Sequence, residues 1–391
     1  MPRRGSLAAA LLIAALNLRL MVAAVPPVLG QIRAGTGLSS VGAGLLTGAP
    51  VLCFGLAALA SPRLIRRFSM GPALTLVLAT VIAGAVIRLV PTVTALFLGT
   101  VLLGSAIAVG NVLLPALIKR DFHSRRVMMT ALYSLALSAG AAIAGGLTVP
   151  IERLTGLGWR GAVALWALPA ALALLLWAPH VREEAGGDDD GHGTPIRALW
   201  RSPLAWCVSV FMGAQSFGFY GTLSWLPTIA RSHGLSATHA GLLLSLASFS
   251  GMFGALAAPP FQRRIASGRG AVSTCVAACA IGYGGLLLAP GSLIDLWCLV
   301  FGLGQGALLA LALGYIVERA PDSHHAAQLS TMAQSVGYLI ASTGPLLMGA
   351  LHSATGSWTP PIVLLLASLV AVFLTGLVAS QDRHVLAPRT A

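Results

Sequence analysis

Long apolar runs alternate with short polar segments along the whole chain. A helix that crosses a bilayer needs about 20 consecutive apolar residues, and runs of this kind recur twelve times. The pattern therefore predicts an all-α integral membrane protein with twelve transmembrane helices. The predicted spans are residues 7–29, 39–60, 71–90, 93–118, 128–150, 159–177, 203–230, 237–260, 270–289, 293–317, 325–350 and 358–379.

The second half of the chain repeats the first at a constant offset of 197 positions. The run Gly-Leu-Ser at 37–39 recurs at 234–236, and the arginine pair at 66–67 recurs at 263–264. Matches of small and apolar residues alone would be weak in so biased a composition, but the arginine pairs make the repeat convincing. These pairs either mark the topology or latch the closed cytoplasmic face, and the sequence favours neither interpretation.

The repeat predicts how the helices are organised. Each half carries six spans, an even number, so both halves enter the membrane in the same direction. We expect two parallel six-helix bundles, at residues 1–178 and 203–391, joined by a cytoplasmic linker at 179–202. Bundles related in this way rock against each other and expose a central site to alternate sides of the membrane.

Composition and charge narrow the class of protein. Only 9% of the residues are charged, against about 25% in an average soluble domain, which excludes a soluble enzyme and a nucleic-acid binder. Lys and Arg outnumber Asp and Glu by 24 to 11, and 18 of the 24 lie on the side of the N-terminus against five on the other side. Positive residues concentrate on the cytoplasmic side, so we expect a multi-pass protein of the cytoplasmic (inner) membrane with both termini in the cytoplasm.

The sequence predicts no cofactor, no metal site and no disulfide. All five cysteines fall in apolar runs, and no span contains a His-Glu-x-x-His motif or facing carboxylates. A membrane enzyme is therefore disfavoured, and so is a receptor, because the longest loop is too short for a signalling domain. The expected partners are the lipid bilayer and a small-molecule substrate, and the protein is expected to be monomeric.

Arg19 lies near the middle of the first span and is the only charged residue placed deep in the membrane. On insertion scales, a charge at that depth costs about 2.5–3.5 kcal/mol, so it should face water, a partner or a ligand. No acidic residue lies deep enough to pair with it. A guanidinium offers five donors and a fixed positive charge, which favours recognition of a small anion. The alternative is an arginine that caps backbone carbonyls between helices.

Other polar and aromatic residues inside the spans complete the expected site. The first, fourth, seventh and tenth spans should line the central cavity. For each buried amide, hydrogen bonding between helices is as good an explanation as ligand contact. The predicted substrate-binding residues are Arg19, Asn17, Asn111, Gln215, Phe219, Tyr220, Gln305, Gln334 and Tyr338.

Several motifs together resemble a known family. They are Asn-Leu-Arg at 17–19, Gly-Asn-Val-Leu-Leu-Pro at 110–115, Trp-Leu-Pro at 225–227, Gln-Ser-Val-Gly-Tyr at 334–338 and Thr-Gly-Ser-Trp at 355–358. The chain resembles the cyanate permease family (CynX/NimT type) of the major facilitator superfamily over nearly its whole length. The resemblance implies the major facilitator fold and a permease that carries cyanate-like or other small organic anions.

These observations predict a secondary transporter of a small polar or anionic solute that works by alternating access. The alternative is an exporter of drug-like compounds such as nitroimidazoles, which the resemblance also allows. The low aromatic content of 6% and the single buried arginine favour a transporter of a small polar or anionic solute.

Overall fold

The computed structural model describes residues 2–122, 126–181, 196–265, 267–288, 291, 293–321 and 323–385. Every regular element in these ranges is a helix, which confirms the predicted all-α class. The helices are α1 (Pro2–Ala23), η1 (Pro26–Val28), α2 (Leu29–Thr36), α3 (Ser40–Phe68), α4 (Met70–Ile87), α5 (Val93–Asp121), α6 (Arg126–Thr155), α7 (Gly158–Leu165), α8 (Ala167–Trp177), η3 (Ala178–His180), η4 (Ile196–Arg201), α9 (Pro203–Ser232), α10 (Ala237–Ile265), α11 (Gly268–Leu288), α12 (Ile294–Glu318), α13 (Ser323–Thr355) and α14 (Thr359–Ala379). Most of the expected linker, residues 182–195, and the side chains of Arg66, Arg67 and Arg263 lie outside the described residues.

Each predicted span falls on a helix or on a pair of consecutive helices. Within the described ranges, nine helical stretches are long and apolar enough to cross a membrane. Helix α9 is not among them, although it has 30 residues, because it carries Gln215, Ser216 and other polar side chains. Its residues 211–227 are buried almost without exception. Other helices therefore shield α9 from lipid, and it can carry polar groups that a lipid-facing helix cannot.

The sixth predicted span is broken into α7 and α8 at Trp166. Pro169 has no N–H to donate to the carbonyl four residues earlier, so the helix cannot continue unchanged through this point. The Asn17 side chain donates to the backbone carbonyl of Trp166 over 3.1 Å, and the Trp166 ring nitrogen donates to the Thr148 hydroxyl over 2.9 Å. Side chains of α1 and α6 thus satisfy polar groups at the break.

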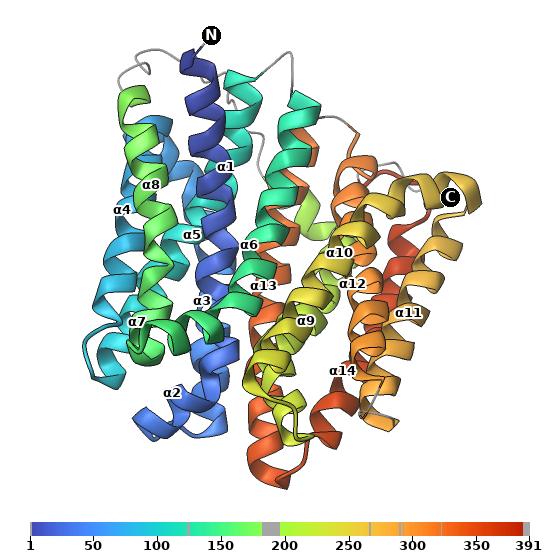
Figure 1. The fold of residues 1–391 in the computed structure, drawn as a ribbon. Coiled ribbons are helices and arrows are strands. Elements are labelled where there is room, and N and C mark those ends of the chain that lie inside the picture. The colour runs from blue at the N-terminus through green and yellow to red at the C-terminus, as the bar shows by residue number, and fades with distance from the viewer. Residues whose placement is uncertain are drawn as a thin grey trace.

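The two halves of the chain form two groups of helices, with both termini at the same end of the molecule (Figure 1). Helix α3 packs along α13, and α6 packs along α10. Under the 197-position repeat, α3 corresponds to α10 and α6 to α13. The two contacts are therefore equivalent, as expected for two halves related by an axis along the membrane normal.

Glycines make these contacts close. A Cβ at Gly44 of α3 would stand 2.5 Å from the carbonyl oxygen of Pro345 in α13. A Cβ at Gly241 of α10 would stand at the same distance from the carbonyl oxygen of Gly145 in α6. Beside it, the Ser245 hydroxyl donates to the Ala142 carbonyl over 2.5 Å. Small residues at membrane helix contacts allow this approach, and here they bring the halves together toward the end opposite the termini.

Candidate functional site

Arg19 lies near the C-terminal end of α1, four residues before Ala23, and its side chain reaches α9 in the second half of the molecule. Its guanidinium donates a hydrogen bond to the Tyr220 hydroxyl on α9. The guanidinium carbon lies 5.6 Å from the centre of the Tyr220 ring and 5.9 Å from the centre of the Phe219 ring, within range for a cation–π interaction. No carboxylate among the described residues pairs with Arg19. Its positive charge is therefore solvated by aromatic groups and remains uncompensated.

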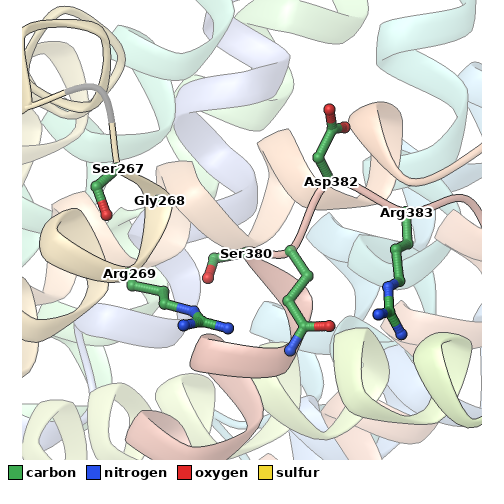
Figure 2. Close-up of a pocket in the computed structure, with 7 residues that line it drawn as sticks. Ser267, Gly268, Arg269, Ser380, Asp382 and Arg383 are labelled. Carbon is green, nitrogen blue, oxygen red and sulfur yellow. The ribbon is translucent and has the colours of Figure 1, made fainter.

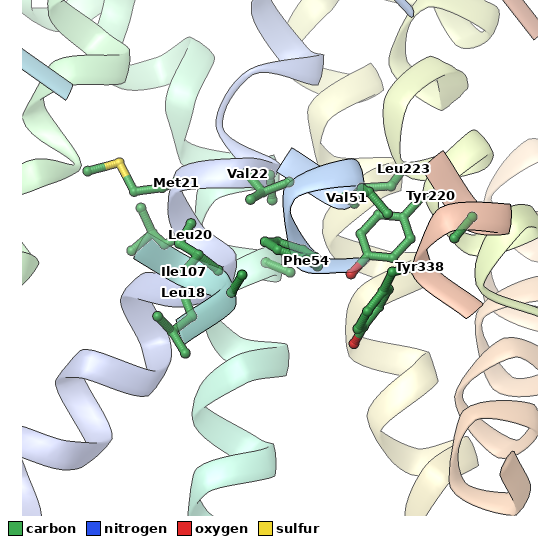
Figure 3. Close-up of a cluster of buried hydrophobic side chains, with 14 of the residues drawn as sticks. Leu18, Leu20, Met21, Val22, Val51, Phe54, Ile107, Tyr220, Leu223 and Tyr338 are labelled. Atoms are coloured by element: carbon green, nitrogen blue, oxygen red, sulfur yellow. The ribbon is translucent and has the colours of Figure 1, made fainter. Parts of the chain in front are cut away.

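Phe219 and Tyr220 belong to a group of four rings in contact with one another, which we call the aromatic cluster: Phe54, Phe219, Tyr220 and Tyr338. Tyr220 lies edge-on to Phe219 at a centroid distance of 5.1 Å, and Phe54 lies edge-on to Tyr338 at 5.6 Å. Figure 3 shows Phe54 beside Tyr220 and Tyr338. Such pairs are worth about 0.5–1.5 kcal/mol beyond the area that they bury, so the cluster holds its rings in defined positions.

The aromatic cluster joins the two halves of the chain. Arg19 and Phe54 come from α1 and α3, whereas Phe219, Tyr220 and Tyr338 come from α9 and α13. Most of these side chains are buried, but Arg19 and Phe219 remain partly exposed. A guanidinium with free donors, enclosed by ring faces and edges, can bind a small planar or linear anion by charge-assisted hydrogen bonds.

Two residues of the candidate site were not expected from the sequence. Phe54 packs against both cluster tyrosines, and Tyr133 of α6 is close enough for an electrostatic interaction with Arg19. Phe54 carries no signal that separates it from other apolar residues of its span. Tyr133 carries a signal that sequence reasoning could have used, because the chain has only five tyrosines. Three of them interact with Arg19.

The predicted amides lie away from the aromatic cluster or are engaged elsewhere. The side-chain amide of Asn17 donates to the backbone carbonyl of Trp166 at the helix break, and the side-chain oxygen of Asn17 is buried without a partner. Gln215 donates to the Ser216 hydroxyl and to the carbonyl of Met212, within α9. Asn17 therefore connects α1 to the break between α7 and α8, whereas Gln215 bonds only within its own helix.

The remaining three amides lie in three different surroundings. Gln334 donates to Ser330, one turn earlier on α13. Gln305 of α12 donates to the Tyr283 hydroxyl over 3.2 Å, and its carbonyl oxygen is buried without a partner. Asn111 of α5 is partly exposed and makes no hydrogen bond within the described residues. Of the predicted set, the structure therefore brings together Arg19, Phe219, Tyr220 and Tyr338.

Within the described ranges, no group of three or more His, Cys, Asp or Glu residues is placed to hold a metal ion. The five cysteines are free thiols, four of them buried.

Comparison with known proteins gives a family match. Residues 7–345 match the model of the Major Facilitator Superfamily. The chain is 40% identical over 382 residues to the 2-nitroimidazole transporter of Escherichia coli (strain K12), covering 97% of this chain and 96% of that protein. It is 30% identical over 349 residues to the cyanate transport protein CynX of the same organism, covering 89% and 90% respectively.

Solved structures share the fold. A bacterial homologue of the human lysosomal transporter Spinster, in an inward-facing and unoccupied conformation, matches with a TM-score of 0.78 at 18% identity, covering 98% of this chain and 99% of that one. A D-xylose–proton symporter matches with a TM-score of 0.75 at 14% identity, covering 97% and 98%. These likenesses confirm the predicted architecture of two parallel six-helix repeats.

Proposed function

Because the chain belongs to the major facilitator superfamily and is a secondary transporter of small solutes rather than an enzyme, we propose that its substrate is a small anion bound by Arg19. The observation that carries this proposal is the uncompensated guanidinium at the junction of the two halves. A cationic substrate would be repelled there, and an uncharged one would leave the charge unused. Among the relatives, one is named for cyanate, a small anion.

The geometry suggests how binding is coupled to movement. Arg19 moves with the first half and Tyr220 with the second, so their hydrogen bond must change when the halves rock. A bound anion would replace or share this bond and would itself connect the two halves. The contacts of α3 with α13 and of α6 with α10 would then open and close on either side of the substrate.

The protein is a multi-pass membrane protein. We further propose that it lies in the inner membrane as a monomer, with both termini in the cytoplasm. The strong excess of Lys and Arg on the side of the termini supports this orientation.

A second candidate function is export of nitroimidazole-like compounds. The relative named for 2-nitroimidazole is 40% identical to this chain, and the aromatic cluster offers ring faces on which a flat heterocycle can stack. This function depends on the rings more than on the charge of Arg19.

Transport by purified protein in proteoliposomes tests the proposal and separates the two candidates. Arg19→Gln removes the charge but keeps hydrogen-bonding capacity. A hydrogen bond to a charged group contributes about 1.5–3 kcal/mol to binding. Its loss should raise the KM for a transported anion about 10- to 100-fold. Cyanate, small aromatic carboxylates and 2-nitroimidazole would be compared, with Arg201→Gln, at an exposed position outside the spans, as the control.

Anion transport that is unchanged in Arg19→Gln would contradict the proposal, provided the variant elutes as a single folded species. Loss of anion transport with intact 2-nitroimidazole transport in Arg19→Gln would mean that the protein carries both solutes and requires the Arg19 charge only for the anion. Transport of 2-nitroimidazole alone, by both variants, would favour the second candidate.

A further inference from the structure

A second polar site lies at the end of the second half that carries the chain termini. It is a pocket of about 380 Å³ between the start of α11 and the segment that follows α14. Its lining residues are Ser267, Gly268, Arg269, Ser380, Gln381, Asp382 and Arg383. The pocket shares no lining residue with Arg19 or the aromatic cluster, so it is separate from the site proposed above for transport.

The pocket has a net positive charge. Arg269 and Arg383 are both exposed and form no ion pair with a described residue. The single acid, Asp382, bonds at 3.2 Å to Arg319, which is itself buried. Figure 2 shows the Asp382 carboxylate pointing away from both pocket guanidiniums. Two arginines are thus left to face an anionic ligand.

The pocket also offers neutral donors. The Ser267 hydroxyl accepts the backbone N–H of Gly270 at the start of α11, so its own hydrogen is free to be donated. Gln381 lines the pocket with a side-chain amide. The first turn of a 21-residue helix adds a partial positive charge. A phosphate group accepts hydrogen bonds from guanidinium, hydroxyl and amide groups such as these.

An apolar stripe leads to this pocket along α14. Val370, Leu374 and Val378 follow one another at intervals of four residues and are 59%, 57% and 37% exposed. Residues four apart lie on one face of a helix, and this face continues into Gln381 and Asp382 at the rim of the pocket. In a helix long and apolar enough to cross a membrane, such an exposed apolar face is suited to contact with acyl chains.

We propose that this pocket binds the phosphate of an anionic phospholipid, whose acyl chains lie along the exposed stripe of α14. The charge and the donors of the pocket would be equally suited to free phosphate. The stripe decides in favour of a lipid, because it provides a continuous apolar path from the headgroup position into the membrane. Basic pockets at helix ends on the cytoplasmic side are suited to acidic headgroups.

Native mass spectrometry of the full-length protein in detergent tests the proposal. The wild-type protein would be titrated with phosphatidylglycerol and with phosphatidylcholine. Each arginine near the surface contributes about fivefold to the affinity for anionic lipid, so Arg269→Gln/Arg383→Gln should weaken phosphatidylglycerol binding by at least about fivefold. Binding of phosphatidylcholine, which has no net charge, should change little.

The matched control is Arg120→Gln/Arg201→Gln, which removes the same charge at the same end of the molecule but outside the pocket. Equal weakening in both double variants, or in neither, would overturn the proposal. A third arm adds inorganic phosphate to the phosphatidylglycerol complex. Displacement of the lipid by phosphate at equal concentration would show a site for the free anion and would overturn the assignment to lipid.

Discussion

At the scale of single residues, the partner of Arg19 determines what it can bind. A buried carboxylate would neutralise the guanidinium, and separating the two would leave an uncompensated charge. In this site Tyr220 accepts one hydrogen bond from Arg19 in place of a carboxylate. The rings of Phe219 and Tyr220 interact with the cation through their π-systems. Since these contacts leave the net charge in place, an anion can still gain full electrostatic attraction.

The hydroxyl of Tyr220 should contribute to this recognition by orienting the guanidinium. Removing it in Tyr220→Phe costs one hydrogen bond, and we expect the KM for the transported anion to rise about 2- to 10-fold. Tyr283→Phe is the matched control, because Tyr283 is equally buried but bonds to Thr222 and Gln305 outside the aromatic cluster. Equal KM values for Tyr220→Phe and wild-type protein in the same flux assay would exclude this role.

Sequence reasoning could reach part of the candidate site. Arg19 stands out because a charge deep in a span is costly, and Phe219, Tyr220 and Tyr338 lie in the same structural neighbourhood. The amides could not be assigned in this way, because a buried amide signals only that it has a partner. Asn17 illustrates this point: its partner is a carbonyl freed where the sixth span breaks, and the sequence around Asn17 does not reveal this contact with a residue 149 positions away.

At the scale of helices, hydropathy located the twelve spans but not their irregularities. The run at 159–177 is continuous in hydropathy, yet α7 ends before Trp166 and α8 begins after it. Pro169 was a visible signal for this break. Helix α2 after the first span was also unexpected, and it ends at Gly37, which has a φ of 71°. Such a conformation favours glycine, so the sequence does mark the end of α2.

The glycines between the halves give a prediction at this scale. Gly44→Ala places a methyl group where Pro345 stands and should force α3 and α13 apart. We expect a lower thermal unfolding temperature and slower transport. Gly284→Ala is the control, because α11 offers open space there and no atom lies within 4 Å of the added carbon. Replacing glycine by alanine in a helix stabilises it by about 0.5–1 kcal/mol when there is room.

Both properties would be measured on the purified variants, by a thermal shift assay and by flux into proteoliposomes. A Gly44→Ala protein as stable and active as Gly284→Ala would mean that the contact between α3 and α13 is looser than its geometry indicates.

At the scale of the whole molecule, the repeat explains why the contacts between the halves come in equivalent pairs. The halves share their fold but not the residues around Arg19. At the position equivalent to Arg19 the second half has Ser216, and at the position equivalent to Tyr338 the first half has Ala141. The architecture is thus nearly symmetric, whereas the recognition site is not. A single charge from one half meets aromatic residues from the other, and a solute bound between them contacts both.

The most direct test of anion recognition at Arg19 is a structure with selenocyanate, a cyanate analogue whose selenium can be located by anomalous scattering. We predict a selenium peak beside the Arg19 guanidinium and within the aromatic cluster, absent from crystals of Arg19→Gln. A selenium peak elsewhere in the protein, with the bond between Arg19 and Tyr220 unchanged, would contradict the account.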